Sequence, residues 1–241
     1  MHSLGHTRSA YRHDHLVHTP DTFIRAPWPG MQRATAIVHA SPVLGAAFTQ
    51  YTLEFEPGGS VAPAAATLQR FVYVLEGTVQ LGDADVGIGG YAWWPPGSVP
   101  ALTSADGGRA AVIEKPYRFL PDVAVPAALI GSEPNLEAQP LLGDPDLEVR
   151  ALVPSSPGFD FAVNTLTYRP GASLPLVEVH VMEHGLLFLE GGGIYRLGDC
   201  WYPVTRGDFI YMAPYCPQWF GALGKTGAKY LIYKDWNRAA S

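Results

Sequence analysis

The chain has 241 residues, which allows one large domain or two smaller ones. Nearly half of the residues are hydrophobic, so a substantial core can form, and the net charge of −6 without a basic patch argues against a nucleic-acid partner. No apolar run is long enough to span a bilayer, and the first 20 residues lack the apolar stretch of a secretory signal, so we expect a cytoplasmic protein.

The N-terminal 34 residues are predicted to form an arm outside the folded domains. This region is polar and rich in histidine, and the arm is expected to be mobile or loosely docked. Adventitious metal binding is the alternative, through His2, His6, His13, His15 and His18.

An internal repeat organises the rest of the chain. In the first copy, Gly58 is followed by an apolar run that ends at Gly77. In the second copy, Gly171 is followed by an apolar run that ends at Gly191. The two intervals are nearly equal, at 77 − 58 = 19 and 191 − 171 = 20 positions. Such self-similarity predicts that each half is the same fold unit.

Each copy is typical of short β-strands separated by tight turns. Runs rich in Val, Tyr, Phe and Trp are closed by Gly and Pro, and no long stretch shows a convincing helical period. Many short, evenly spaced strands favour a sandwich or a barrel. We therefore predict an all-β protein with one unit over residues 35–134 and a second over residues 135–241. The proline-rich stretch 115–147 is expected to be an extended connection.

The second copy contains a cluster of residue types that bind metals. Glu178, His180 and His184 lie within seven residues, in a stretch with no other histidine. Residues two apart on a strand share a face, so Glu178 and His180 are expected to point the same way. A carboxylate with two imidazoles is a recurrent open metal set. Buried, hydrogen-bonded core histidines are the alternative.

The last apolar run places Tyr230, Ile232 and Lys234 on one face of a predicted strand. A lysine that points into a core is costly unless it is paired. A nearby cation would lower its pKa, so that Lys234 could exchange protons. It could otherwise pair with a substrate carboxylate, or extend from the strand end into solvent.

These spacings resemble those of the cupin superfamily, and the two copies resemble a bicupin, with two double-stranded β-helix (jelly-roll) barrels in one chain. Relative to the usual motifs, Glu178 stands in a His position, His184 stands in a Glu position, and Gln218 replaces a His. The corresponding residues of the first copy cannot bind a metal; they are Ala65, Thr67, Arg70 and Ala101. The first barrel is therefore expected to be metal-free and structural.

The second half resembles the (S)-ureidoglycine aminohydrolase family in particular. The resemblance rests on Glu178-Val-His-Val-Met-Glu-His-Gly185, on Pro217-Gln218-Trp219 and on Tyr230-Leu-Ile-Tyr-Lys-Asp235. It is strong over residues 139–238 and weaker over residues 35–120. It implies a manganese-dependent enzyme of purine (allantoin) catabolism that hydrolyses (S)-ureidoglycine to (S)-ureidoglycolate and ammonia.

The resemblance also implies which residues form the site. One Mn²⁺ per chain would be held by Glu178, His180, His184 and Gln218. The substrate would be contacted by Glu178, Gln218, Tyr230 and Lys234, and the catalytic residues would be Glu178 and Lys234. Lys234 could bind the substrate carboxylate or move a proton, and Tyr230 could hold the ureido group.

Other functions remain compatible with these residues. Two histidines and a carboxylate also hold Fe(II), so a different metal-dependent cupin such as a dioxygenase is one alternative, and a non-enzymatic bicupin binding protein is another. The expected partners are a small molecule with carboxylate, amine and ureido groups and further copies of the chain, because cupins commonly pair exposed strand edges. Cys200 and Cys216 are expected to be reduced thiols.

Overall fold

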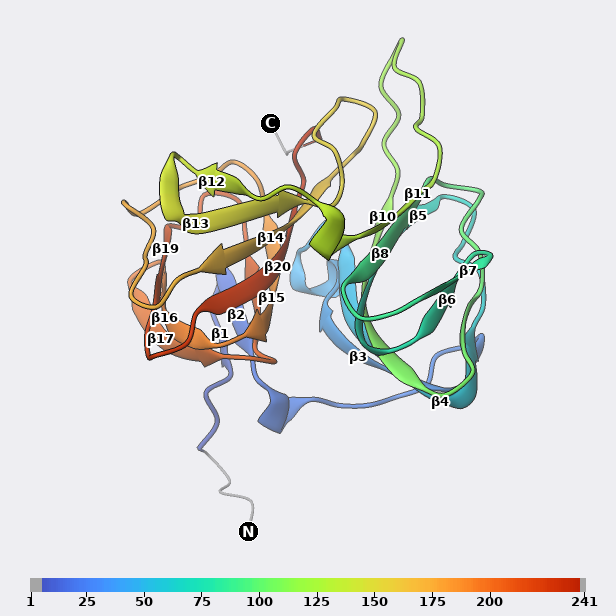
Figure 1. Cartoon of the computed structure of the whole chain (residues 1–241), viewed down its shortest axis with the longest axis horizontal. Coiled ribbons are helices and arrows are strands. Elements are labelled where there is room, and N and C mark those ends of the chain that lie inside the picture. Colours follow the sequence, from blue (N-terminus) through green and yellow to red (C-terminus); the bar gives the residue numbers. More distant parts are fainter. Residues whose placement is uncertain (1–5, 239–241) are drawn as a thin grey trace. The chain divides into compact units, whose positions relative to one another are not determined.

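The structure is a computed structural model that describes residues 6–238 (Figure 1). It is 52% strand and 4% helical, which confirms the predicted all-β class. In the described part of the chain, the helical residues form the short 3-10 turns η1 (Pro20–Thr22), η2 (Pro42–Leu44) and η3 (Glu133–Asn135). No helix among residues 6–238 is long and apolar enough to cross a membrane.

The contacts within the chain divide it into two compact units. Unit 1 contains residues 6–23, 137–155 and 161–238, and unit 2 contains residues 24–136 and 156–160. The chain passes from unit 2 to unit 1 between Leu136 and Glu137, and residues 6–34 are divided between the two units at Phe23–Ile24.

Unit 2 contains one curled antiparallel sheet of nine strands. Their order is β11–β8–β5–β10–β4–β9–β6–β7, and β3 pairs with β4. The strand bounds are β3 (Met31–Ala40), β4 (Thr49–Val61), β5 (Leu68–Gly77), β6 (Val79–Leu81), β7 (Ala84–Val86), β8 (Gly90–Trp94), β9 (Leu102–Ser104), β10 (Gly108–Pro116) and β11 (Leu129–Ser132). Side chains that alternate along the strands form its core, including Val72 and Val74 of β5 and Ala110 and Val112 of β10.

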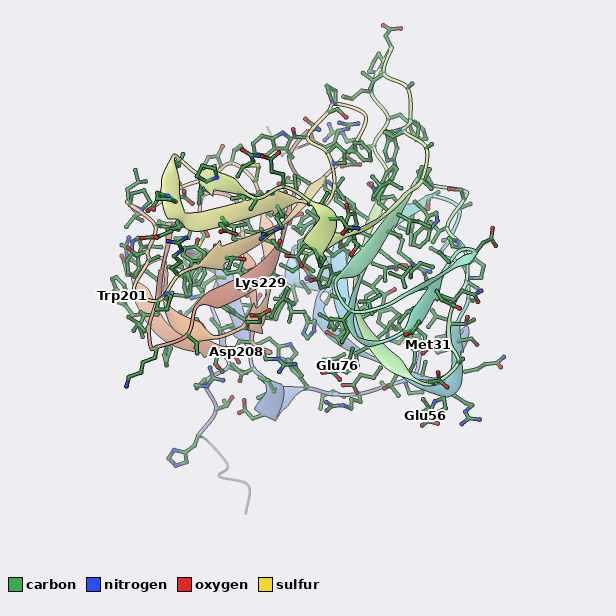
Figure 2. The ribbon with its side chains drawn as sticks, in the orientation of Figure 1. Met31, Glu56, Glu76, Trp201, Asp208 and Lys229 are labelled. Atoms are coloured by element: carbon green, nitrogen blue, oxygen red, sulfur yellow. The ribbon has the colours of Figure 1, made fainter. Side chains whose placement is uncertain are left out.

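Unit 1 contains an eight-stranded sheet, in the order β1–β2–β18–β15–β20–β14–β13–β12, and a three-stranded sheet, in the order β17–β16–β19. The strand bounds are β1 (Ala10–Tyr11), β2 (His15–His18), β12 (Gln139–Leu141), β13 (Asp144–Ala151), β14 (Ala162–Tyr168), β15 (His184–Glu190), β16 (Gly192–Leu197), β17 (Cys200–Thr205), β18 (Phe209–Met212), β19 (Gln218–Ala222) and β20 (Ala228–Lys234). Leu186 and Phe188 of β15 and Ile232 of β20 lie in its core, and side chains fill the space between the strands of each unit (Figure 2).

The repeat seen in the sequence recurs in the order of the strands. Unit 1 contains the series β18–β15–β20–β14–β13, and unit 2 contains β8–β5–β10–β4–β3 in the same arrangement. The two motif glycines also have the same local role. Gly77 and Gly191 both have positive φ angles, of 68° and 60°. A Cβ atom at Gly191 would lie 2.1 Å from the carbonyl oxygen of Gly227, so a side chain cannot fit there without movement of the backbone.

Residues 8–18 are docked in unit 1, so the prediction of a mobile or loosely docked arm is wrong for this part of the chain. Strand β2 pairs with β18 along its whole length, and within it His15 and Val17 are buried. Arg8 donates a hydrogen bond to Asp208 Oδ1 over 2.8 Å, and Asp208 is fully buried (labelled in Figure 2). Successive side chains of a strand point to opposite faces, so His15 and Val17 of β2 share the buried face. His2 lies outside the described residues.

Candidate functional site

Three segments of unit 1 bring the predicted site residues together. His184 begins β15, Lys234 ends β20, and the two residues lie directly opposite each other in the sheet. Gln218 begins β19, where it pairs with Glu178 through two reciprocal backbone hydrogen bonds of 2.8 Å. The sheets therefore fix the backbones of four predicted residues that are far apart in sequence.

Glu178 and His180 do not lie on a common strand, in contrast to the prediction. Apart from the Glu178–Gln218 bridge, the segment 175–183 is irregular. Pro175 lacks a backbone donor, which weakens strand pairing at the start of this segment. The two side chains still meet, because His180 Nε2 lies 3.1 Å from Glu178 Oε2. Both are partly buried, with side-chain exposures of 31% for His180 and 20% for Glu178.

His184 is the most unusual residue of the group. Its side chain is buried, and neither ring nitrogen has a hydrogen-bond partner of acceptable geometry among the described residues. Burial lowers its pKa well below the ordinary value, and the charges of Lys234 and His180 act in the same direction. A buried polar group without a partner is costly. A neutral imidazole with one free nitrogen lone pair suits a metal ligand.

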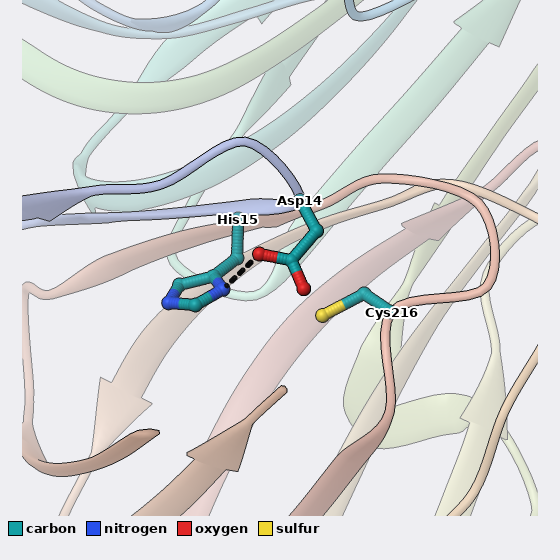
Figure 3. A group of neighbouring side chains, drawn as sticks. All are labelled: Asp14, His15 and Cys216. Carbon is teal, nitrogen blue, oxygen red and sulfur yellow. Dashed lines mark hydrogen bonds and ion pairs between the residues drawn. The ribbon is translucent and has the colours of Figure 1, made fainter. Parts of the chain in front are cut away.

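His180 and His184 lie edge to face, with ring centroids 5.3 Å apart and an interplanar angle of 76°. The donor atoms of Glu178, His180 and His184 do not all lie within 4.8 Å of one another. Among residues 6–238, the group of carboxylate, imidazole and thiol donors that does so is Asp14, His15 and Cys216 (Figure 3). Glu178, His180 and His184 are therefore neighbours in unit 1, but their donor atoms are too far apart to form a tight cluster.

The sequence predictions missed two tyrosines that contact predicted site residues. The Tyr195 hydroxyl donates a 2.7 Å hydrogen bond to Gln218 Oε1, and the Tyr168 and Tyr230 hydroxyls lie 2.7 Å apart. Burial raises the pKa of all three tyrosines, so they stay protonated and can donate hydrogen bonds. Strand alternation identifies Tyr168 and Tyr195 as inward-facing, but it cannot identify the partner of either hydroxyl.

The Lys234 carbonyl accepts a hydrogen bond from Trp236 N over 2.8 Å, whereas its side-chain ammonium group has no hydrogen bond or salt bridge with another of the described residues. Burial lowers the pKa of its ammonium group, and the negative charge of Glu178 partly counteracts this. His184 and Lys234 are thus two adjacent basic groups whose charged forms the interior disfavours. An anionic group or a group that takes up a proton would be well placed beside them.

Unit 2 has a salt bridge at the corresponding positions. Arg70 lies seven residues before Gly77, as His184 lies seven before Gly191, and it pairs in the sheet with Glu114 as His184 pairs with Lys234. Arg70 Nε lies 2.7 Å from Glu114 Oε1, and the Arg70 side chain is only 4% exposed. The opposite charges of Arg70 and Glu114 therefore compensate each other. The other corresponding positions offer no imidazole, thiol or carboxylate; they are Ala65, Thr67 and Ala101.

The chain is similar to curated and solved proteins over nearly its whole length. No family model matches it. It is 38% identical to the (S)-ureidoglycine aminohydrolase of Arabidopsis thaliana over 241 aligned positions, which cover 97% of this chain and 80% of the relative. It is 31% identical to the enzyme of the same name from Escherichia coli (strain K12), over 91% of this chain and 87% of the relative. The crystal structure of protein Ylba from E. coli has a TM-score of 0.86 at 28% identity, covering 99% of this chain and 98% of the other. The structural neighbours have cupin folds.

Proposed function

The chain belongs to the (S)-ureidoglycine aminohydrolase family, a family of hydrolases, and on that premise we propose that it hydrolyses (S)-ureidoglycine to (S)-ureidoglycolate and ammonia in purine catabolism. In this reaction a C–N bond breaks and a C–O bond to water forms on the same carbon. The attacking water gives up one proton and the departing nitrogen takes up one. A site for this reaction needs groups that hold the substrate and groups that transfer these protons.

The proposed cofactor is Mn²⁺, held by Glu178, His180, His184 and Gln218. Two oxygen donors and two imidazoles form a ligand set that suits this ion. When bound, the cation would supply Lewis acidity and a fixed point for orienting the substrate. The observation that carries the proposal is the buried His184 side chain, whose two ring nitrogens have no hydrogen-bond partner of acceptable geometry among the described residues. Gln218 Oε1 accepts from Tyr195 and keeps a second lone pair for ligation.

Lys234 and Glu178 are assigned the proton transfers. The lowered pKa of Lys234 brings its two protonation states closer in free energy at neutral pH, which is what a proton-transfer group requires. Lys234 delivers a proton to the departing nitrogen, and the Glu178 carboxylate accepts one from the attacking water. The two groups interact electrostatically, since the charge of Glu178 raises the pKa of Lys234.

Tyr230 is assigned to bind the ureido group. Its hydroxyl is oriented by the 2.7 Å contact with the Tyr168 hydroxyl, and both side chains are buried. A pair of protonated phenols offers one donor and further acceptor capacity, which matches the carbonyl and the N–H groups of a urea. Tyr168 therefore acts as a positioning residue for Tyr230.

We further propose that each unit is a cupin barrel and that the chain forms a homo-oligomer. The shared strand order of the two units supports the first part. The salt bridge between Arg70 and Glu114 supports a metal-free, structural role for unit 2. A run of exposed apolar side chains supports assembly, because such groups tend to be covered by a partner; they are Leu176, Val177, Val179 and Val181.

The activity is tested with freshly prepared (S)-ureidoglycine and Mn²⁺-loaded protein. Ammonia release should exceed the spontaneous rate, and His184→Asn should lower both the Mn²⁺ content and the rate. Arg70→Met is the matched control in unit 2, and it should keep the metal content of the wild type. If the wild-type protein releases ammonia no faster than the buffer, the proposed function is wrong.

A further inference from the structure

Three donors of different chemistry meet in unit 1 apart from the proposed catalytic residues. Asp14 precedes β2, His15 is its first residue, and Cys216 lies in the turn between β18 and β19. One donor atom from each residue lies within 4.8 Å of the other two (Figure 3). His15 and Cys216 are buried, with exposures of 3% and 5%. Carboxylate, imidazole and thiol are the three side-chain types that bind zinc in proteins.

His15 is oriented as a metal-binding histidine would be. Its Nδ1 faces the cluster, 2.8 Å from Asp14 Oδ1, and its Nε2 lies 2.8 Å from the Tyr202 hydroxyl. If Nε2–H donates to Tyr202, the lone pair of Nδ1 points at the cluster. Histidine ligands of metals commonly donate their second nitrogen in this way, which fixes the ring and its tautomer. Burial also lowers the pKa of His15, which favours the neutral imidazole.

The backbone around the cluster is held in place and leaves room beside Asp14. Ala213 N donates to the Asp14 carbonyl over 2.9 Å, and Gly198 N donates to the Pro217 carbonyl over 2.8 Å. Gly198 has a φ of +56°, and a Cβ atom there would lie 3.1 Å from Asp14 Oδ2. A glycine at this position therefore keeps the space next to the carboxylate clear.

We propose that Asp14, His15 and Cys216 form a second metal site, suited to Zn²⁺, that fastens the N-terminal strand to the turn leading into Gln218. Ligand bonds of about 2.0–2.3 Å place tetrahedral donors about 3.3–3.8 Å apart. Donors at the observed limit of 4.8 Å would have to close by about 1.0–1.5 Å, and the Asp14–His15 pair, at 2.8 Å, would have to open by about 0.5 Å or more. A water molecule would complete the four ligands, and the Cys216 thiol would lose its proton to solvent on binding.

The competing explanation is a hydrogen-bonded network with no metal. Burial and the neighbouring Asp14 raise the pKa of Cys216 to about 12, so in the absence of a cation the thiol keeps its proton. Both explanations predict that the cluster stabilises unit 1. They differ in whether a cation binds there with a thiolate ligand, and spectroscopy detects this directly.

The test uses Co²⁺ as a spectroscopic probe for zinc in the full-length protein. A thiolate–cobalt charge-transfer band in the near ultraviolet should appear in the wild type and in the matched control Cys200→Ser. It should disappear in Cys216→Ser and bleach when Zn²⁺ is added. The band should persist in His184→Asn, because the proposed manganese ligands include no sulfur.

Asp14→Asn provides a second variant if Cys216→Ser does not fold, and it should weaken Co²⁺ binding at least tenfold. The absence of a band in the folded wild-type protein would overturn the proposal, as would a band that is lost in Cys200→Ser. None of these readouts depends on ammonia release, so the zinc site and the hydrolase function can fail independently.

Discussion

Tyr195→Phe tests whether the hydrogen bond to Gln218 helps to build the metal site. The substitution removes one hydroxyl that donates over 2.7 Å to Gln218 Oε1, and both side chains are buried. It leaves a buried acceptor with one partner fewer, which costs about 1–2 kcal/mol of stability. Loss of a residue that orients a metal ligand typically weakens metal affinity about 10–100-fold, or roughly 1.4–2.7 kcal/mol.

The matched control is Tyr117→Phe. The Tyr117 hydroxyl is also buried and donates over 2.6 Å to the Gly158 carbonyl, within unit 2. Both variants should lose similar free energy of unfolding in urea titrations. In competition with a chelator, only Tyr195→Phe should lose Mn²⁺ affinity. Equal Mn²⁺ affinity in wild type and Tyr195→Phe would refute the assignment of Gln218 as a ligand oriented by Tyr195.

Three further predictions concern stability. Asp160→Asn should cost about 3–5 kcal/mol, because Asp160 is fully buried and accepts hydrogen bonds from Lys115 Nζ over 2.8 Å and Arg118 N over 2.7 Å. Asp146→Asn, which breaks the exposed salt bridge to Arg169, should change the free energy of unfolding by less than ~1 kcal/mol in the same urea titrations. Equal losses in the two variants would show that burial does not strengthen the Asp160 contacts. Gly191→Ala should lower the melting temperature far more than Gly171→Ala, because both glycines have a positive φ but only at Gly191 would a Cβ atom meet a backbone carbonyl. Similar shifts in the two variants would show that the cost comes from the positive φ and not from this contact. In protein freed of metal by a chelator, the free energy of unfolding should fall as the pH drops below about 6.5. His184 should contribute up to about 1.4 kcal/mol per pH unit to this fall, because its imidazole binds a proton in the unfolded chain but stays neutral in the folded protein. His184→Asn should remove this share of the slope, and an unchanged slope would mean that His184 is not held neutral.

The sequence contained enough information for the all-β fold class. Glycine spacing identified the repeat because Gly77 and Gly191 occupy positions where a side chain meets a backbone carbonyl. Alternation correctly indicated that Tyr230 and Ile232 face the core of unit 1. These features depend on local backbone geometry, which neighbouring residues determine.

Features that depend on distant contacts were predicted less well. His15 and Val17 looked like part of a polar arm, yet they lie in strand β2, which pairs with β18, nearly 200 residues away in the sequence. Glu178 and His180 were expected on one strand, but the pairing of Glu178 with Gln218 leaves the rest of that segment irregular. Neither outcome follows from local periodicity, because each depends on which distant backbone offers hydrogen bonds.

The difference between the halves also needed the structure. The sequence suggested only that Arg70 cannot bind a metal. Its pairing with Glu114, in the register that His184 and Lys234 share, explains how unit 2 buries a charge at this position without a cofactor. Since the pair is buried, removing either partner should destabilise unit 2 rather than create a site.

A parallel measurement of bound Mn²⁺ and ammonia release for the wild type and for Gln218→Ala tests whether this protein is a manganese-dependent hydrolase. We expect about one Mn²⁺ bound outside the Asp14–His15–Cys216 cluster, release of ammonia from (S)-ureidoglycine above the spontaneous rate, and loss of both in Gln218→Ala. A wild-type protein that releases ammonia at full rate after Mn²⁺ is removed, or a Gln218→Ala variant that keeps both properties, would contradict this expectation.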